Sequence, residues 1–185
     1  MTPQPAKPRV LIVDDHPANR RAFESLLEEG YTLGVAATGH QALELTLRDD
    51  YAVILMDVRM PGMDGFEVAD LLRKRERTRH TPIVFISAFD QTVLQLKKGY
   101  VAGATDFIFS PVDEELLKLK VQTYVQIYLR NEALRLKIHE LERTLGLLHA
   151  EFDRLDPSRT VLNQRIKDLE STVLVMKLEL NAVRT

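Results

Sequence analysis

Residues 51–65 read YAVILMDVRMPGMDG, and this stretch decides the fold of the 185-residue chain. The run from Ala52 to Met56 is apolar without interruption, which is typical of a strand buried on both faces in a parallel sheet. The run ends at a carboxylate, Asp57, and a turn at Pro61–Gly62 follows it. Open α/β sheets bind their ligands beyond the carboxyl ends of the strands, so Asp57 lies where a functional group is expected. The alternative is an aspartate that only caps a turn.

The sequence on both sides of this stretch alternates between strand and helix patterns. Helical spacing of apolar residues predicts helices from Pro17 to before Gly30, over 39–48, over 66–74 and, more weakly, over 91–101. Short β-branched or apolar runs predict strands at 10–13, 32–36, 52–57, 83–86 and 106–109. This alternation predicts an α/β fold with a five-stranded doubly wound parallel sheet.

From about Asp113 the pattern stays helical and follows heptads. Apolar residues at a and d positions predict a left-handed coiled coil, and the polar Asn131 at an a position favours a parallel homodimer. We therefore expect a disordered lead-in over 1–8, a globular domain over 9–125 and a coiled-coil dimerisation and signalling helix over 126–185. The predicted dimer seam consists of Leu117, Tyr124, Ile127, Asn131, Leu134, Ile138, Leu141, Leu145, Leu148, Phe152 and Leu155.

Pro157 interrupts this helical region and allows two interpretations. Asp156–Pro157 is a good N-cap and N1 pair, so a second helix could start there and fold back as a hairpin. The heptad phase, however, is the same on both sides of the proline, which favours a kinked continuous rod. We expect the rod.

Three acids follow predicted strands: Asp14 and Asp15 after the first and Asp57 after the third. The two strands are neighbours in a doubly wound sheet, so the carboxylates converge at one edge and repel one another. A hard divalent cation removes this conflict, and Mg²⁺ prefers carboxylate and phosphate oxygens. The alternative is a cluster of acids that caps turns.

These residues together resemble the response-regulator receiver domain of two-component signalling. The resemblance is carried by the Asp14–Asp15 pair, by MDVRMPGMDG at 56–65, by Ser87–Ala88 and by Phe107 ahead of a residue–proline pair. It covers about residues 8–125 and implies a flavodoxin-like fold.

The resemblance also implies a role for each site residue. Asp57 is then the phosphoacceptor, which takes a phosphoryl group from a histidine kinase or a phosphotransfer protein. Mg²⁺ is held by Asp14, Asp15, Asp57 and the backbone carbonyl of Arg59. Ser87 contacts a phosphoryl oxygen, and its movement lets Phe107 swing inward.

One residue departs from the family pattern. Receivers carry a lysine directly before the proline that follows the fifth strand, and this chain has Ser110 there. Loss of a charged contact in a partly buried site costs about 1.5–3 kcal/mol. The departure leaves open a pseudo-receiver that acts as a constitutive dimeric scaffold, and Arg59 could partly replace the missing cation.

Composition narrows the remaining choices. A net charge of −2 gives no case for nucleic acid, the absence of cysteine fits a reducing compartment, and no apolar run is long enough for a membrane helix. We expect a cytoplasmic protein with a downstream protein partner or a missing output domain. Kinase activity is not expected, because no ATP-binding domain is present. A histidine phosphotransfer role for His139 is the weakest alternative.

Overall fold

The computed structural model describes residues 7–88, 101–152 and 160–182. The helix predicted over 91–101, except for Val101, and most of the predicted lead-in lie outside these ranges. The chain divides into two compact units, residues 1–126 and residues 127–185. Within the described ranges, no helix is both long and apolar enough to span a bilayer.

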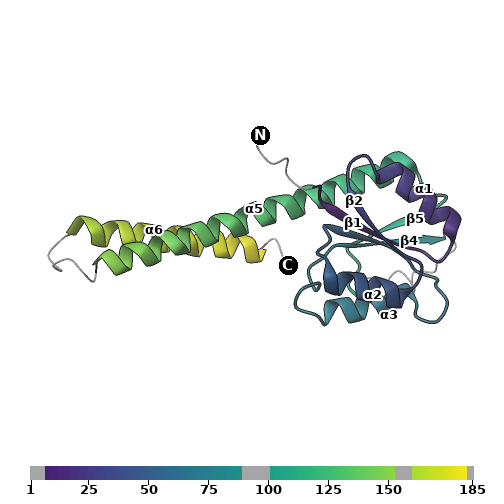
Figure 1. Cartoon of the computed structure of the whole chain (residues 1–185), viewed down its shortest axis with the longest axis horizontal. Helices are drawn as coiled ribbons and strands as arrows, with labels where there is room; N and C mark the ends of the chain where they lie inside the picture. The colour runs from purple at the N-terminus through teal and green to yellow at the C-terminus, as the bar shows by residue number, and fades with distance from the viewer. Residues whose placement is uncertain (1–6, 89–100, 153–159, 183–185) are drawn as a thin grey trace. The chain divides into compact units, whose positions relative to one another are not determined.

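The first unit is a parallel sheet with helices on both faces, as predicted. The sheet has five strands in the order β2-β1-β3-β4-β5. Helices α2 and α3 cover one face, whereas α1 and the first turns of α5 cover the other (Figure 1). The elements are β1 (Arg9–Val13), α1 (Pro17–Leu27), β2 (Thr32–Ala36), α2 (Gly39–Arg48), β3 (Val53–Asp57), α3 (Gly65–Arg73), β4 (Ile83–Ala88) and β5 (Asp106–Ser110).

The core lies around β3, as the opening stretch predicts. Residues 52–56 are completely buried, because β3 pairs with β1 on one side and β4 on the other and helices cover both faces. The turn after β3 needs glycine twice. Gly62 has a φ of +82°, which side chains rarely adopt, and a Cβ at Gly65 would collide with the Asp57 carbonyl oxygen. The glycines of this segment therefore let α3 begin directly against the end of β3.

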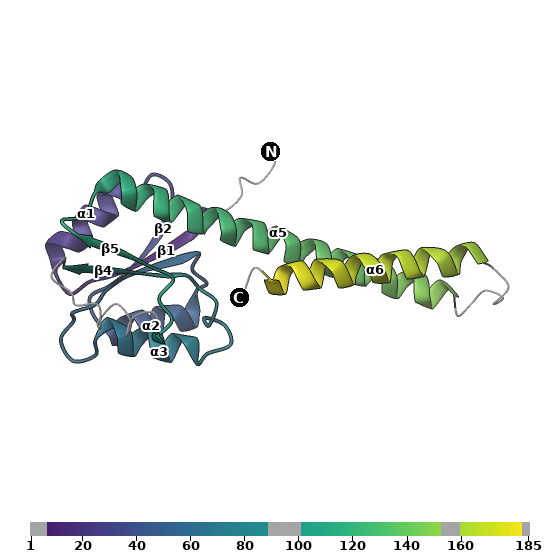
Figure 2. The same ribbon diagram turned by 180° about the vertical axis from the view of Figure 1, so that it is seen from behind.

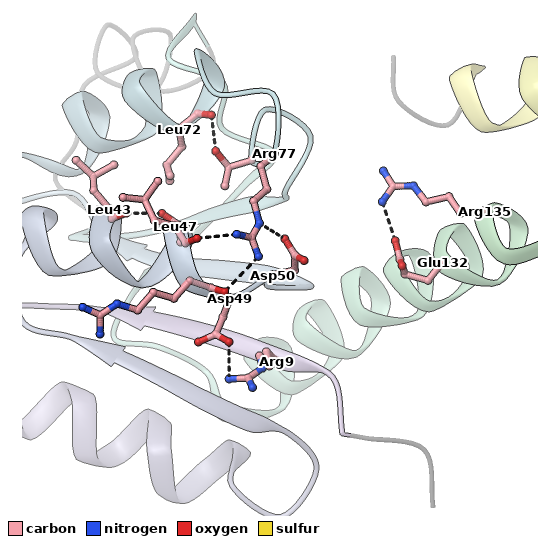
Figure 3. A network of polar contacts seen from close by, with 12 residues as sticks. Arg9, Leu43, Leu47, Asp49, Asp50, Leu72, Arg77, Glu132 and Arg135 are labelled. Atoms are coloured by element: carbon pink, nitrogen blue, oxygen red, sulfur yellow. Dashed lines mark hydrogen bonds and ion pairs between the residues drawn. The ribbon is translucent and has the colours of Figure 1, made fainter. Parts of the chain in front are cut away.

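Side-chain networks tie the loops at the opposite end of the sheet together. Arg77 donates to Asp50 Oδ1 at 2.6 Å and to the Leu47 carbonyl at 2.6 Å (Figure 3). Arg9 pairs with Asp49 at 3.3 Å in the same region. These contacts join the end of α2 to the segment after α3 and to β1, at the edge away from Asp57.

Helix α5 (Glu114–Phe152) begins as part of the first unit. The Asp113 side chain caps it by accepting from the Leu116 N–H at 2.8 Å. Leu117 and Val121 are fully buried, and the Tyr124 hydroxyl donates to Asp106 Oδ2 at 3.1 Å. Leu117 and Tyr124 were predicted as dimer-seam residues, and that prediction is wrong, because they pack against and bond to the first unit of their own chain.

The second unit is an antiparallel helical hairpin, so the predicted continuous rod is wrong. Helix α6 (Thr160–Ala182) lies alongside α5 in both views (Figures 1 and 2). Lys177 pairs with Glu142 at 2.5 Å, and Glu170 pairs with His149 at 3.6 Å. The partner number falls as the number along α5 rises, which requires opposite directions.

From Ile138 to Phe152, the predicted seam residues form a packed stripe of α5 that runs beside α6. Leu134, Leu141, Leu145, Leu148 and Phe152 are half-buried and Ile138 is buried, while the matching stripe of α6 contains buried Ile166 and Val173. Heptad periodicity specifies an apolar stripe and leaves the partner helix open. Asn131 is half-buried, Ile127 is 40% exposed, and Leu155 lies outside the described residues.

Candidate functional site

The site forms where β1, β3 and β4 end at the same edge of the sheet. Asp57 is the last residue of β3 and is paired in register with Ile86, the residue before Ser87. Asp14 directly follows β1, the other neighbour of β3. The strand order therefore brings the predicted acids and Ser87 to one edge, as the sequence implied.

The side chain of Asp57 ionises less readily than an ordinary carboxyl group. Its pKa is raised to about 6, chiefly by burial and then by the negative charges of Asp14 and Asp15. The backbone N–H groups of Arg59 and Val58 donate to the carboxylate and oppose this rise. The Arg59 side chain is exposed. A cation bound nearby would stabilise the ionised form of this carboxyl group.

Asp14 is held in place by its neighbours. It is 1% exposed and accepts from the His16 N–H at 2.8 Å and from Asn19 Nδ2 at 2.9 Å. Its backbone carbonyl accepts from Arg20 Nη1 at 2.6 Å. Asn19 and Arg20 lie on the first turn of α1, so this helix orients the first acid of the pair.

His16 belongs to this cluster, and sequence reasoning missed it. Its Nδ1 lies 2.8 Å from Asp15 Oδ1, and ligand atoms of Asp14, Asp15 and His16 all lie within 4.8 Å of one another. The signal was its position directly after the acid pair. The five histidines of the chain show no ligand spacing among themselves, so spacing gave no pointer to it.

The cluster fits a hard divalent cation. Two carboxylates lie close together after β1, and a third at the end of β3 has its ionised form disfavoured by them. A cation shared by the three would remove this repulsion, and carboxylate oxygens are the ligands that Mg²⁺ prefers.

Ser87 has an unsatisfied hydroxyl. The residue is 3% exposed, and its Oγ has no hydrogen-bond partner among the described residues. Buried polar atoms are nearly always paired, so a lone hydroxyl next to a carboxylate site indicates a place where a ligand oxygen binds.

Phe107 already occupies an inward position. Its ring is 7% exposed and lies 5.5 Å from the ring of Phe85, which in turn contacts Phe66 at 4.9 Å. The inward movement expected from the resemblance therefore needs an outward state that this structure does not contain.

Ser110 ends β5 next to this aromatic group. It is exposed and pairs in register with Ala88 at the end of β4. Both strands run further than predicted, because the β4–β5 ladder continues through Ser87 to Ala88. Ser110 thus lies at the same edge of the sheet as Asp57, but it brings no charge there.

Comparison with known proteins agrees with this geometry. The family described as response regulator receiver domain matches residues 10–122. The response regulator PleD of Caulobacter vibrioides is 38% identical over 149 residues, which is 80% of this chain and 32% of PleD. A probable cyclic di-GMP phosphodiesterase of Vibrio cholerae is 31% identical over 79% of this chain and 33% of its own length. The chain thus spans about a third of these relatives.

Solved structures give the same result for the first unit. The chemotaxis protein CheY4 of Vibrio cholerae superimposes with a TM-score of 0.61 and 31% identity, over 64% of this chain and 99% of CheY4. The receiver domain of the sensor histidine kinase PA1611 of Pseudomonas aeruginosa was solved with magnesium in its active site cleft. It superimposes with a TM-score of 0.61 and 30% identity, over 65% of this chain and 99% of that receiver domain. The chain therefore belongs to the response regulator receiver domain family of two-component signalling.

Proposed function

We propose that Asp57 accepts a phosphoryl group from the phosphohistidine of a histidine kinase or a phosphotransfer protein. A carboxylate oxygen of Asp57 attacks phosphorus, the bond between phosphorus and the imidazole nitrogen breaks, and the imidazole leaves with a proton from solvent. The observation that carries this proposal is the unsatisfied hydroxyl of Ser87, which directly follows the register partner of Asp57. No described residue accepts or donates a hydrogen bond at this hydroxyl, so it is available to bond a phosphoryl oxygen.

The acidic cluster supports the same reaction. Mg²⁺ bound there would neutralise charge on the phosphoryl oxygens as it builds up. Asp14, Asp15 and Asp57, with the Arg59 carbonyl, are the residues we assign to it. The His16 N–H and Asn19 hold the Asp14 carboxylate in one orientation, which favours this role.

We propose that helix α5 carries the change away from the site. Asp106 directly precedes Phe107 on β5, and its carboxylate bonds to both Lys120 and Tyr124 of α5. A shift of Phe107 therefore acts on a strand that is already bonded to the helix. The downstream component is a protein partner or an output domain, and the cyclic di-GMP phosphodiesterase among the relatives makes cyclic di-GMP turnover one candidate for the process it controls.

The test is direct phosphorylation of the full chain. The protein is incubated with Mg²⁺ and acetyl phosphate, and intact mass is followed beside an Asp57→Asn control. We expect an acid-labile adduct of one phosphoryl group on the wild type and none on the control. Absence of an adduct on the wild type would reject phosphotransfer and favour the pseudo-receiver scaffold, for which Ser110 is the supporting observation.

Transmission is tested separately from phosphorylation. Amide hydrogen exchange of α5 is measured with and without the phosphodonor, on wild type and Asp57→Asn. An adduct that leaves exchange in 114–126 unchanged would keep Asp57 as the phosphoacceptor and reject α5 as the carrier.

A further inference from the structure

Helix α1 begins at a residue whose side chain does not cap it. His16 is the N-cap residue, with an extended backbone (φ −83°, ψ 116°) and no hydrogen bond from its side chain to the first turn. Serine, threonine, aspartate and asparagine are preferred at this position, because their side chains accept from the free N–H groups of that turn. The His16 imidazole lies against the acid pair instead, with Nδ1 2.8 Å from Asp15 Oδ1. Its placement is therefore explained by the acids and not by the helix.

The three side chains after β1 have the spacing of ligands around one ion. His16 Nδ1 lies 2.8 Å from Asp15 Oδ1 and 3.8 Å from Asp14 Oδ1, and ligand atoms of all three residues lie within 4.8 Å of one another. Nitrogen and oxygen ligands bind a small divalent ion at about 2.1 Å, so adjacent ligands are about 3.0 Å apart and opposite ligands about 4.2 Å apart. The imidazole thus needs little movement to share an ion with the two acids.

Two further observations indicate that a ligand binds at this edge of the sheet. The Ser87 hydroxyl is buried and has no hydrogen-bond partner among the described residues, whereas buried polar atoms are nearly always paired. Burial, and then the negative charges of Asp14 and Asp15, raise the pKa of Asp57 at the end of β3. The edge therefore has both an unused hydroxyl and an excess of negative charge for a cation to offset.

A neutral imidazole differs from a fourth acid in two ways. It adds a ligand atom without adding negative charge to a site that already has three carboxylates. It also changes which ions bind best, since imidazole suits transition-metal ions, whereas Mg²⁺ prefers oxygen ligands. A set of three carboxylates and one imidazole therefore favours transition-metal dications over Mg²⁺.

The contact between His16 and Asp15 does not prevent coordination by the imidazole. Coordination through Nδ1 requires the tautomer that carries its proton on Nε2. The His16 side chain is 70% exposed, so water can accept from Nε2–H and no buried partner is lost. Asp14 keeps its orientation in either tautomer, because it accepts from the backbone N–H of His16 and from Asn19.

We propose that His16 binds the cation of this site through Nδ1, together with the three carboxylates, and that it gives the site a preference for a transition-metal ion such as Mn²⁺ over Mg²⁺. This role rests on the cation site proposed for the acids, and it does not require phosphorylation of Asp57. Because Ser110 brings no charge to this edge of the sheet, an ion held more tightly would supply positive charge there at a lower concentration.

Metal affinity, measured without phosphodonor, provides the first test. Isothermal titration calorimetry compares Mg²⁺ and Mn²⁺ on the untagged full chain and on His16→Ser, which keeps the backbone N–H and gives α1 a favoured N-cap residue. We expect wild type to bind Mn²⁺ about 10-fold or more tightly than Mg²⁺. The substitution should weaken Mn²⁺ binding by about 10-fold and Mg²⁺ binding by less than about threefold. The matched control is His139→Gln, an exposed histidine of α5, which should change neither affinity.

Each alternative gives a different result. An equal loss for the two ions would show that His16 only orients Asp15, and no loss for either would show an ordinary surface histidine; both results overturn the proposal. Asp57→Asn should weaken both ions. A wild type that binds neither ion at millimolar concentrations would reject the cation site along with the role of His16, whereas the phosphoryl adduct on Asp57 is measured separately by intact mass.

Spectroscopy of bound Mn²⁺ provides the second test, because a directly bound nitrogen nucleus modulates the electron spin echo of the ion. We expect nitrogen modulation for wild type and for His139→Gln. His16→Ser should lose the modulation while it still binds Mn²⁺ through the carboxylates. Bound Mn²⁺ without nitrogen modulation in the wild type, or with equal modulation in His16→Ser, would reject His16 as a ligand.

Discussion

Asp57 combines two demands that conflict when the site holds no cation. Burial and the two acids after β1 oppose its ionisation, yet the phosphotransfer proposed for Asp57 needs the carboxylate. Its pKa of about 6 means that the ionised form at neutral pH destabilises the fold. The proposed function and the stability of the cation-free fold therefore place opposite demands on this residue.

Replacing Asp57 with asparagine is expected to stabilise the cation-free protein at neutral pH. The native carboxyl holds its proton to a higher pH than the unfolded one, because its pKa is about 6 in place of 3.8. The native state then binds more protons between these values, so wild-type stability falls as pH rises through this window. Above pH 6 the gain for Asp57→Asn is about 1–2 kcal/mol after solvent screening of a half-exposed group, and below about pH 4 it vanishes.

Urea denaturation in EDTA at pH 4 and pH 7.5 measures this gain. Glu44→Gln, an exposed carboxyl on α2, is the control and should not change the free energy of unfolding at either pH. Added Mg²⁺ should reduce the difference by stabilising the wild type. A gain of equal size at both pH values would show that the charge of Asp57 is not its source.

Position 110 lacks the positive charge that receiver domains carry before the proline after the fifth strand. The serine contributes no charge at the edge of the sheet where Asp57 lies. A charge-assisted contact is worth about 1.5–3 kcal/mol, so Ser110→Lys should speed formation of the phosphoryl adduct by about 10- to 100-fold. Adduct mass against time on acetyl phosphate gives the rate. Ser110→Met has similar reach without charge, and equal rates for the two variants would contradict the electrostatic explanation.

The carboxylate of Asp106 on β5 bonds to two side chains of α5, Lys120 and Tyr124. Burial raises the pKa of Asp106, but hydrogen bonds from Lys120, the Phe107 N–H and Tyr124, together with the Lys120 charge, hold it below its usual value. A depressed pKa contributes stability above the unfolded value, and that stability is lost as pH falls through the native value.

We expect Asp106→Asn to loosen the start of α5. The asparagine keeps one acceptor but loses the charge facing Lys120, so the free energy of unfolding should fall by about 1 kcal/mol or less at pH 7, since the pair is partly exposed. The loss should shrink below about pH 4, where the wild-type carboxyl begins to take up a proton. Amide exchange over 114–126 should rise at pH 7. Unchanged exchange there would show that the buried Leu117 and Val121 alone hold the helix.

At the scale of the whole molecule, the hairpin decides which surfaces remain available. Because α6 runs beside the heptad seam of α5 from Ile138 to Phe152, that part of the seam cannot also serve a second chain while the hairpin is closed. Exposed leucines, such as Leu136, Leu147 and Leu178, are the apolar side chains that the described part of the second unit leaves open to solvent.

The hairpin predicts an intrachain cross-link. The side chains of Glu142 and Lys177 reach each other from neighbouring helices, so cysteines at both positions should be joined within one chain at low concentration by a short bis-maleimide. Non-reducing electrophoresis should show a compact monomer band. The matched control carries cysteine at 142 and at 167, which lies ten residues from 177 on α6. Cross-linking only between chains would contradict the hairpin and favour the rod.

Local pattern was enough to predict the sheet and much of its site. The buried run 52–56 ends at Asp57, and strand alternation alone puts the ends of neighbouring strands at one edge, so the three acids and Ser87 could be brought together in advance. His16 was missed because its role depends on the turn that brings its imidazole onto Asp15, and this turn has no periodic signal.

Partner choice was what the sequence could not settle. Heptads determine that α5 and α6 each bear an apolar stripe, but the same stripe packs equally well against a second chain, a folded-back helix or, in the case of Leu117, the sheet of its own domain. Only the tertiary structure decides among these, because the choice rests on long-range contacts such as Glu142 with Lys177 and Asp106 with Tyr124. By itself the sequence determined the sheet and the acids around Asp57, since those follow from which residues each strand buries and where it stops.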